Sequence, residues 1–348
     1  MSFPFNIYVL AFVSAGLTSG LTMPWWRSWC ARRGLVDDPG HRKIHETPVP
    51  LAGGLAVMTG LAVPLLMSIL MVCFTFFALK WVVPDGAFPA GASLAGLDLN
   101  TLDLLRYGLS RRGLRLLAIL LGALGMVILG WLDDKHELSP GIKFGGQLCI
   151  ATLVAASGIR ITLFVESTLF SYLVTVLWIL TVTNALNFMD NMNGLCAGLG
   201  VIAAWCFAWS AAVHGQYLVA LIAFQSCGAL LGFLPFNFPK ASAFLGDAGS
   251  HLAGYVLAVL AILPHFYSST TPNVWAVLSP LLILAAPLGD LVCVVVLRWK
   301  LGQPFYVGDN NHLSHRLVRR GCSRSAAVLF IWLLAAASGA LALMVLQR

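Results

Sequence analysis

The sequence has little charge for its length. Only 10% of its 348 residues are Asp, Glu, Lys or Arg, whereas 59% are hydrophobic and the mean hydropathy is +0.86. Soluble domains carry about a quarter charged residues, so this composition excludes a soluble fold and predicts a polytopic membrane protein. The net charge of +7 fits basic loops at a membrane surface, and we expect no nucleic-acid partner.

Several chemical signatures are also missing. The eight cysteines are scattered without a CxxC pair or metal-ligand spacing, as is typical of small residues in helix packing. No HExxH, GxSxG or Walker loop is present, so protease, esterase and NTPase chemistry have no support. No internal repeat or linker divides the chain, and we expect residues 1–348 to form a single transmembrane domain.

Long apolar runs account for most of the sequence. A spanning helix needs about 20 apolar residues, and this length predicts an all-α protein of about ten transmembrane helices. The candidate spans are residues 3–23, 51–79, 114–132, 144–160, 169–187, 194–213, 216–235, 249–267, 274–297 and 325–346. The first lacks a basic n-region and a small-residue cleavage site, so we expect it to remain as a helix.

The basic residues are distributed unevenly between the loops. Of the 21 Lys and Arg residues, 14 fall in the loops after the odd-numbered spans and six in the opposite loops. The positive-inside rule then places the odd loops in the cytoplasm and both termini outside. The loop at about 80–113 is expected on the outer side.

Acidic residues gather at the predicted cytoplasmic ends. The stretch GWLDDKHELSP puts Asp133 and Asp134 where the third span ends, and FLGDAGSHLAG puts Asp247 just before the eighth. Adjacent carboxylates repel each other unless a cation or proton intervenes, and glycines beside Asp247 allow close backbone approach to a ligand. The alternatives are a solvated helix end and an ordinary N-cap. Asp290 lies inside the ninth span, where an acid usually faces a polar cavity or a partner.

Two further stretches are rich in polar groups. In NALNFMDNMNG, Asn184, Asn187 and Asp190 are three residues apart, lie roughly along one helical face, and offer oxygens that suit Mg²⁺. In GDNNHLSHRLVRRG, His312, His315, Arg316 and Arg319 share a face suited to a phosphate or diphosphate. A positive-inside anchor explains the remaining arginines there but not the paired histidines. Together the clusters indicate a metal–diphosphate site at one membrane surface.

The chain resembles a known family of membrane enzymes. The motifs that carry the resemblance are RKIHETPVPLAGG, GWLDDKHELSPGIKFGGQ, NALNFMDNMNGLCAG, FNFPKASAFLGDAGS, PLGDLVCVVVLRWKLGQPF and DNNHLSHRL, in family order. They are similar to those of the polyprenyl-phosphate N-acetylhexosamine-1-phosphate transferases (bacterial glycosyltransferase family 4), which begin envelope polysaccharides. The resemblance implies ten or more helices with a cytoplasmic active site in the bacterial inner membrane.

The resemblance also implies a reaction. HexNAc-1-phosphate, first of all GlcNAc-1-phosphate, would pass from a UDP-sugar to undecaprenyl phosphate, with UMP released and Mg²⁺ (or Mn²⁺) as cofactor. We expect Asp247 and Asn187 to bind the metal and Asp133, Asp134 and Asp247 to be catalytic. The expected substrate-binding residues are Lys43, His45, Lys143, Asn184, Asn187, Asp190, Asn193, His312, His315 and Arg316.

Two positions depart from the family pattern. Asn193 replaces the second acid of the usual Asp-Gly-x-Asp-Gly run, and the final motif reads His-Leu-Ser-His without its middle histidine. We assign Asn193 to nucleotide binding. The alternatives are a phospho-MurNAc-pentapeptide transferase, whose three-histidine loop differs, a lipid-binding or transport protein, and a family member whose catalysis has decayed. The oligomeric state is open, with a homodimer as one alternative.

Overall fold

The computed structural model describes residues 5–38, 47–82, 93–94, 97–163, 165–264, 274–304 and 311–346. Over these ranges the chain is helical, with two antiparallel pairs of two-residue strands. The helices are α1 (Phe5–Arg32), α2 (Gly53–Val82), α3 (Leu99–His136), α4 (Pro140–Ala156), α5 (Thr168–Phe188), α6 (Leu195–Val213), α7 (Tyr217–Phe233), η1 (Leu234–Phe236), α8 (Gly246–Ile262), η2 (Val274–Leu278), α9 (Ser279–Ile283), α10 (Ala285–Lys300), α11 (Leu313–Arg319) and α12 (Arg324–Leu346). The strand pairs are β1 (Val36–Asp37) with β2 (Val49–Pro50), and β3 (Ser93–Leu94) with β4 (Leu97–Asp98).

Helix α8 lies at the centre of the bundle. All of its residues from Ala248 to Ala261 are buried, and α2, α3, α5 and α6 pack around it. A helix that is apolar on every side is stable only inside a protein or a membrane. The outer helices instead expose large apolar side chains such as Leu70, Leu121, Leu177 and Leu333. This outward-facing apolar surface is the one that lipid covers.

Seven of the described helices are long and apolar enough to cross a membrane, and the count rises to eight if the bent pair around Leu284 is one span. The polytopic helical fold expected from the sequence is therefore confirmed. Each of the ten expected segments contains helix. Helices α4, α7 and α8 have 17 residues each, which is at the short end of the length that spans a bilayer. The short helix η1 extends α7 to 20 residues.

Two expectations are corrected. The segment 274–297 is not one straight span, because its two helical halves meet at 70°. Pro287 lies in the first turn of α10, where its ring would clash with the carbonyl group four residues earlier if the helix were continuous. The expected outer loop at 80–113 is also partly helical, since α3 already begins at Leu99.

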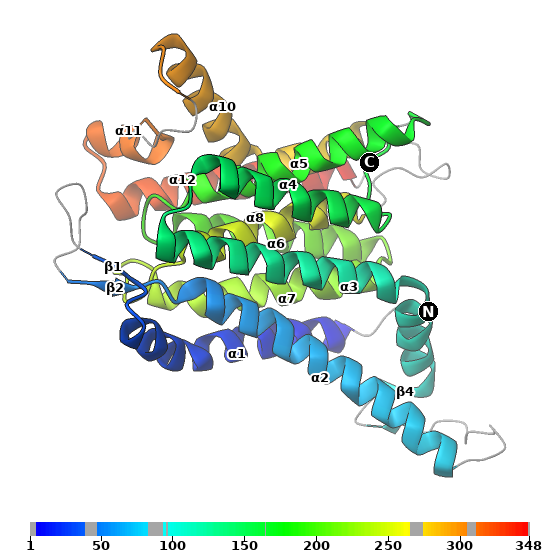
Figure 1. The fold of residues 1–348 in the computed structure, drawn as a ribbon. Helices are drawn as coiled ribbons and strands as arrows, with labels where there is room; N and C mark the ends of the chain where they lie inside the picture. Colours follow the sequence, from blue (N-terminus) through cyan, green and yellow to red (C-terminus); the bar gives the residue numbers. More distant parts are fainter. Residues whose placement is uncertain are drawn as a thin grey trace.

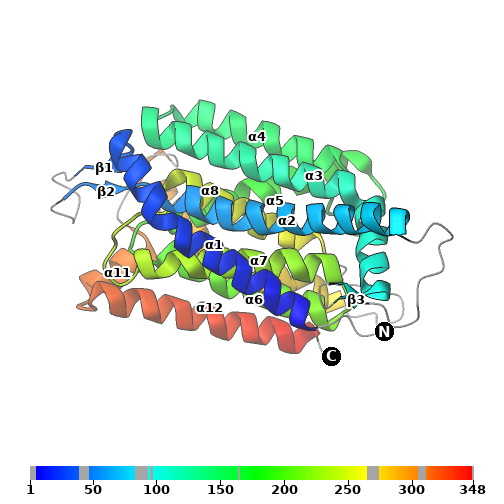
Figure 2. The same ribbon diagram turned by 90° about the horizontal axis from the view of Figure 1, so that it is seen from below.

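The ends of the helices divide the bundle into two faces. In both views the β1–β2 ribbon and α11 lie at one end, and the start of α1 and the end of α12 lie at the other (Figures 1 and 2). Helices α3 and α5 end, and α4 and α8 begin, at the face of the β1–β2 ribbon. The polar motifs of the sequence therefore meet at one face.

This arrangement predicts a topology. Helix α12 carries the chain from α11 to the opposite end of the bundle (Figure 2), so a reporter fused after Arg320 and one fused to the C-terminus should read opposite sides of the membrane. Paired alkaline phosphatase and green fluorescent protein fusions measure this. The same side for both fusions would contradict the placement of α12 as a span.

Candidate functional site

The Asp134 carboxylate organises the site. Its Oδ1 accepts a hydrogen bond from the backbone N–H of Asp247 at 2.8 Å, and its Oδ2 accepts one from Ala248 at 3.1 Å. These amides are at the start of α8, where four backbone N–H groups have no partner within the helix. Asp134 thus caps a neighbouring helix, and α8 needs this because its own N-cap residue, Leu245, offers no side-chain hydrogen bond.

Two glycines make this contact sterically feasible. Gly246 has a φ of +70°, a left-handed conformation that costs other residues about 1–2 kcal/mol. A Cβ atom on Gly130 of α3 would lie 2.4 Å from the backbone carbonyl group of Asp247. The GDAGS motif and the glycine that begins GWLDD therefore serve one purpose, the close approach of α3 to the beginning of α8.

Lys143 joins two of the acids. Its Nζ lies 2.6 Å from Asp133 Oδ2 and 3.0 Å from Asp247 Oδ2. The Nδ2 group of Asn187 donates to Asp247 Oδ1 at 2.5 Å and to Ser250 Oγ at 2.9 Å. The end of α3, the start of α4, the end of α5 and the start of α8 each contribute a side chain. We call Asp133, Asp134, Asp190 and Asp247, with Lys143 and Asn187, the carboxylate cluster.

Asp190 belongs to this cluster by charge and by hydrogen bonding. It lies in the turn after α5 and accepts a hydrogen bond from the backbone of Gly246. Burial, together with the nearby Asp247 and Asp134 carboxylates, raises the pKa of Asp190 to about 8. The Asp190 carboxyl group therefore loses its proton less readily than an isolated carboxyl group does, because of this crowding of negative charge.

Asn184 lies one turn deeper in α5 and has different partners. Its Nδ2 donates to Gln147 Oε1 at 2.7 Å and to the Leu180 carbonyl at 2.8 Å. Gln147 in turn contacts the Nε2 atom of the buried His251 at 3.2 Å. Among the three residues expected on one face, Asn187 and Asp190 thus reach the carboxylate cluster, and Asn184 joins a buried polar network beneath it.

A second group of polar residues involves α10 and α11. Nδ1 of His312 lies 2.6 Å from Asp290 Oδ2, and Asp290 Oδ1 accepts the backbone N–H of Leu313 at 2.6 Å. The ring centroids of His312 and His315 are 6.3 Å apart. Burial, together with the neighbouring His312, Arg319 and Arg324, lowers the pKa of His315. We call Asp290, His312, His315 and Ser314 the histidine cluster.

The turn between α5 and α6 connects the two clusters. Asn191 donates to the Phe188 carbonyl at 2.6 Å and accepts from Ser314 Oγ at 2.6 Å. The Phe188 ring contacts His312, with centroids 5.7 Å apart, and the buried Arg298 guanidinium lies 5.2 Å from the centroid of the same ring. The short Asn/Asp stretch thus contacts the carboxylate cluster on one side and the histidine cluster on the other.

The remaining candidates lie apart from these contacts. Asn193 is at the outer side of the turn, where its Nδ2 donates to the Pro239 carbonyl at 3.3 Å, so its role toward a nucleotide stays a prediction. Arg316 is half-buried on α11 without an ion pair to any described residue. Lys43 and His45 lie outside the described residues, between β1 and β2.

The side chains of the carboxylate cluster supply only some of the ligands that Mg²⁺ needs. Among the described residues, no three His, Cys, Asp or Glu side chains converge as a metal-binding set. Mg²⁺, however, is usually held by one or two carboxylates together with substrate phosphates and water. Asp247 and Asp133 supply such carboxylates, and Asn187 adds an amide oxygen if its side chain turns over. The donor set is therefore compatible with a metal shared between protein and substrate.

Comparison with known proteins decides the family. Residues 116–265, which contain the carboxylate cluster, match glycosyl transferase family 4. A Bacillus subtilis protein named "Probable undecaprenyl-phosphate N-acetylglucosaminyl 1-phosphate transferase" is 31% identical over 334 residues, which is 94% of this chain and 81% of the relative. The chain belongs to glycosyl transferase family 4. The resemblance expected from the six motifs is thereby confirmed.

Other relatives are similar over comparable lengths. A decaprenyl-phosphate N-acetylglucosaminephosphotransferase of Mycolicibacterium smegmatis is 30% identical, over 95% of this chain and 80% of its own. An undecaprenyl-phosphate alpha-N-acetylglucosaminyl 1-phosphate transferase of Escherichia coli is 26% identical, over 93% of this chain and 80% of its own. The similarity therefore covers nearly the whole membrane domain rather than one motif.

Sequence reasoning assigned no site role to three residues that the structure brings to the site. Asp290, Arg298 and Ser314 are all buried in or beside the histidine cluster. Asp290 had a usable signal, because an acid within an apolar span needs a partner. Arg298 was counted among the basic residues of a cytoplasmic loop. No pattern in the sequence around Ser314 predicts its contact with Asn191.

The Asp290–His312 pair generates a test. In Asp290→Asn an amide replaces the carboxylate, so a charge-assisted hydrogen bond worth about 1.5–3 kcal/mol becomes at best a neutral one worth about 1 kcal/mol. The amide can donate as well as accept, so it no longer fixes the tautomer of His312. Transferase turnover should fall by about tenfold or more. His312→Ala combined with Asp290→Asn should be no worse than His312→Ala alone. Additive losses in this double-mutant cycle would show that Asp290 does not act through His312.

Proposed function

We propose that this protein is a phosphotransferase that moves HexNAc-1-phosphate, in the first place GlcNAc-1-phosphate, from a UDP-sugar to undecaprenyl phosphate. The products are undecaprenyl-diphosphate-HexNAc and UMP. The observation that carries the proposal is the 31% identity over 94% of the chain to a relative whose name states this activity. The grouping of the carboxylate and histidine clusters around one turn supports it. A phospho-MurNAc-pentapeptide transferase and a lipid transporter are not favoured by these relatives.

The reaction needs little covalent help from the protein. An oxygen of the lipid phosphate attacks the sugar-bearing phosphorus, the bond from that phosphorus to the bridging oxygen breaks, and UMP leaves with the electron pair. A phosphate monoester is largely ionised at neutral pH, since its second pKa is about 6. Direct attack is therefore proposed in place of a covalent aspartyl intermediate, and the main tasks are positioning and charge neutralisation.

The side chains divide these tasks. Lys143 lies 2.6 Å from Asp133 and 3.0 Å from Asp247, and would hold a phosphate oxygen. His312, oriented by Asp290, and Arg316 on the next turn would hold the diphosphate, as their donor geometry allows. Asp133 is free of the capping role of Asp134, so we assign it to positioning the lipid phosphate.

Mg²⁺ is part of the proposal. Asp247 and Asn187 would hold it, and a bound Mg²⁺ would neutralise diphosphate charge and make UMP a better leaving group. For this the Asn187 amide must turn its oxygen toward the metal, since its Nδ2 now donates to Asp247 Oδ1 at 2.5 Å. Ser250 Oγ lies 2.9 Å from the present position of Asn187 Nδ2 and, once the amide has turned, would donate its O–H to the oxygen in that position.

We further propose that the chain crosses the bacterial inner membrane ten times, with the site on the cytoplasmic face and both termini periplasmic. The excess of Lys and Arg in the loops at the site end supports this orientation. The 17-residue helices α4 and α8 would be about 25 Å long, and burial of α8 at the centre of the bundle removes its need to match the full bilayer thickness.

The activity is tested with purified protein, undecaprenyl phosphate, Mg²⁺ and a panel of UDP-sugars, with UMP release as the readout. UDP-GlcNAc or another simple UDP-HexNAc should be turned over, and UDP-MurNAc-pentapeptide should not, because the three-histidine loop of that branch is missing. Turnover of the pentapeptide substrate alone would reassign the branch. No UMP from any UDP-sugar would refute the proposed reaction.

Asp247 is tested separately. Asp247→Asn keeps the shape but removes the charge that both Lys143 and the proposed metal need, so turnover should fall by at least about tenfold. Glu137→Gln is the matched control, because Glu137 is an exposed acid at the same end of the bundle; its turnover should stay within about twofold. A rate near wild type for Asp247→Asn at saturating Mg²⁺ would place the metal elsewhere.

A further inference from the structure

A cavity of about 120 Å³ lies at the end of the bundle away from the two clusters. It is formed where α4 and α8 end and α7 begins, whereas the carboxylate cluster lies where α4 and α8 begin. Along α3, Arg115 and Asp133 are 18 residues apart, which corresponds to about 27 Å and is close to the thickness of the hydrocarbon core of a bilayer. The cavity is thus at the opposite membrane surface.

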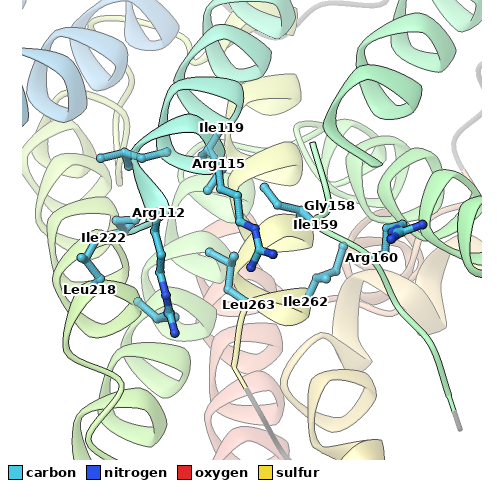
Figure 3. A pocket seen from close by; sticks show the side chains of 12 residues that line it. Arg112, Arg115, Ile119, Gly158, Ile159, Arg160, Leu218, Ile222, Ile262 and Leu263 are labelled. Atoms are coloured by element: carbon cyan, nitrogen blue, oxygen red, sulfur yellow. The ribbon is translucent and has the colours of Figure 1, made fainter. Parts of the chain in front are cut away.

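Three arginines line this cavity. In the view of Figure 3 the Arg115 side chain lies between those of Arg112 and Arg160. No carboxylate is among the lining residues, and no ion pair to an acid is found for these arginines within the described part of the chain. The Arg115 guanidinium lies beside Gly158, 3.7 Å from where a Cβ atom would stand. All three arginines are exposed, so the mouth of the cavity carries positive charge that no acid among the described residues pairs with.

The rest of the lining is aliphatic and continues into an apolar crevice. Ile119 and Ile222 line both the cavity and a second space of about 30 Å³ between α2, α3, α7 and α8. The two polar side chains of the crevice are already satisfied, because Gln225 donates to the Leu61 carbonyl at 2.6 Å and Ser226 to the Ile222 carbonyl at 2.7 Å. The crevice thus presents an apolar wall next to a cationic mouth.

A positively charged mouth beside an apolar wall suits an amphiphilic ligand with an anionic head group. Phosphate suits forked guanidinium donors, and an acyl chain suits the aliphatic wall around Ile119 and Ile222. On any membrane protein, a single arginine at the interface can contact a lipid phosphate. Here three arginines surround one cavity, which is more than anchoring needs. They also lie on the membrane side where the sequence has few basic residues. We propose that the cavity is a binding site for an anionic phospholipid, with its phosphate at Arg112 and Arg115, Arg160 beside them over the Tyr172 ring, and an acyl chain against the aliphatic lining around Ile119 and Ile222.

The test uses the full chain in detergent micelles doped with phosphatidylglycerol or phosphatidylcholine. Native mass spectrometry counts the retained lipid, and the thermal unfolding midpoint reports stabilisation by a bound lipid. Phosphatidylglycerol should bind at least about tenfold more tightly than phosphatidylcholine. Arg115→Gln should remove most of this preference, and Arg115→Lys, which keeps the charge but not the fork, should keep part of it.

The matched control is Arg111→Gln. Arg111 lies on the same helix and near the same membrane surface but does not line the cavity; its guanidinium lies over the Tyr107 ring. This variant should retain the phosphatidylglycerol preference within about twofold. Glycerol phosphate and inorganic phosphate form a further arm and should stabilise the protein far less than the lipid. Equal losses in Arg115→Gln and Arg111→Gln, equal binding of the two lipids, or equal stabilisation by glycerol phosphate would each overturn the proposal.

Discussion

Two hydrogen bonds from the backbone of α8 to the Asp134 carboxylate fix the start of the most buried helix, and the site is built outward from them. An acidic cap at a helix N-terminus is favoured by the unpaired N–H groups and by the helix dipole, and contributes roughly 0.5–2 kcal/mol. Because one of the bound amides belongs to Asp247 itself, the same contact sets where the Asp247 side chain leaves the backbone. The adjacent acids thus have different tasks: Asp134 holds the helix, and Asp133 binds Lys143.

Most of the fold followed from the lengths of the apolar runs, because in a membrane the backbone must satisfy its own hydrogen bonds and long apolar segments become helices. Every expected segment contains helix. The failures have local causes. The bend before α10 depends on Pro287, and hydropathy does not detect one proline within an apolar run. The first turns of α3 contain several charged residues, so hydropathy did not identify them as part of a membrane helix.

The candidate site was predictable where a charge in an apolar chain needs an explanation. Asp133, Asp134, Asp190 and Asp247 were expected to meet at one membrane face, and the structure places them around the start of α8. The partners of each group were not predictable, because they depend on which helices adjoin. Asn184 shares a face with Asn187 but meets Gln147 instead, since α4 adjoins α5 at that depth. Asp290 and His312 are 22 positions apart in the sequence. Helical periodicity relates only residues within a few turns, so it could not predict that these two side chains pair.

Lys143 shows how the ligand-free site balances its charge. It lies in the first turn of α4, where the helix dipole disfavours a cation, and it stays there because Asp133 and Asp247 flank it. An incoming phosphate would compete with these carboxylates for Lys143, and an incoming Mg²⁺ would compete with Lys143 for the carboxylates. Each proposed ligand thereby frees the groups that the other needs. Their binding free energies are then coupled with the same sign in both directions, so in the proposed reaction the metal and the nucleotide diphosphate enter the site as mutually reinforcing partners.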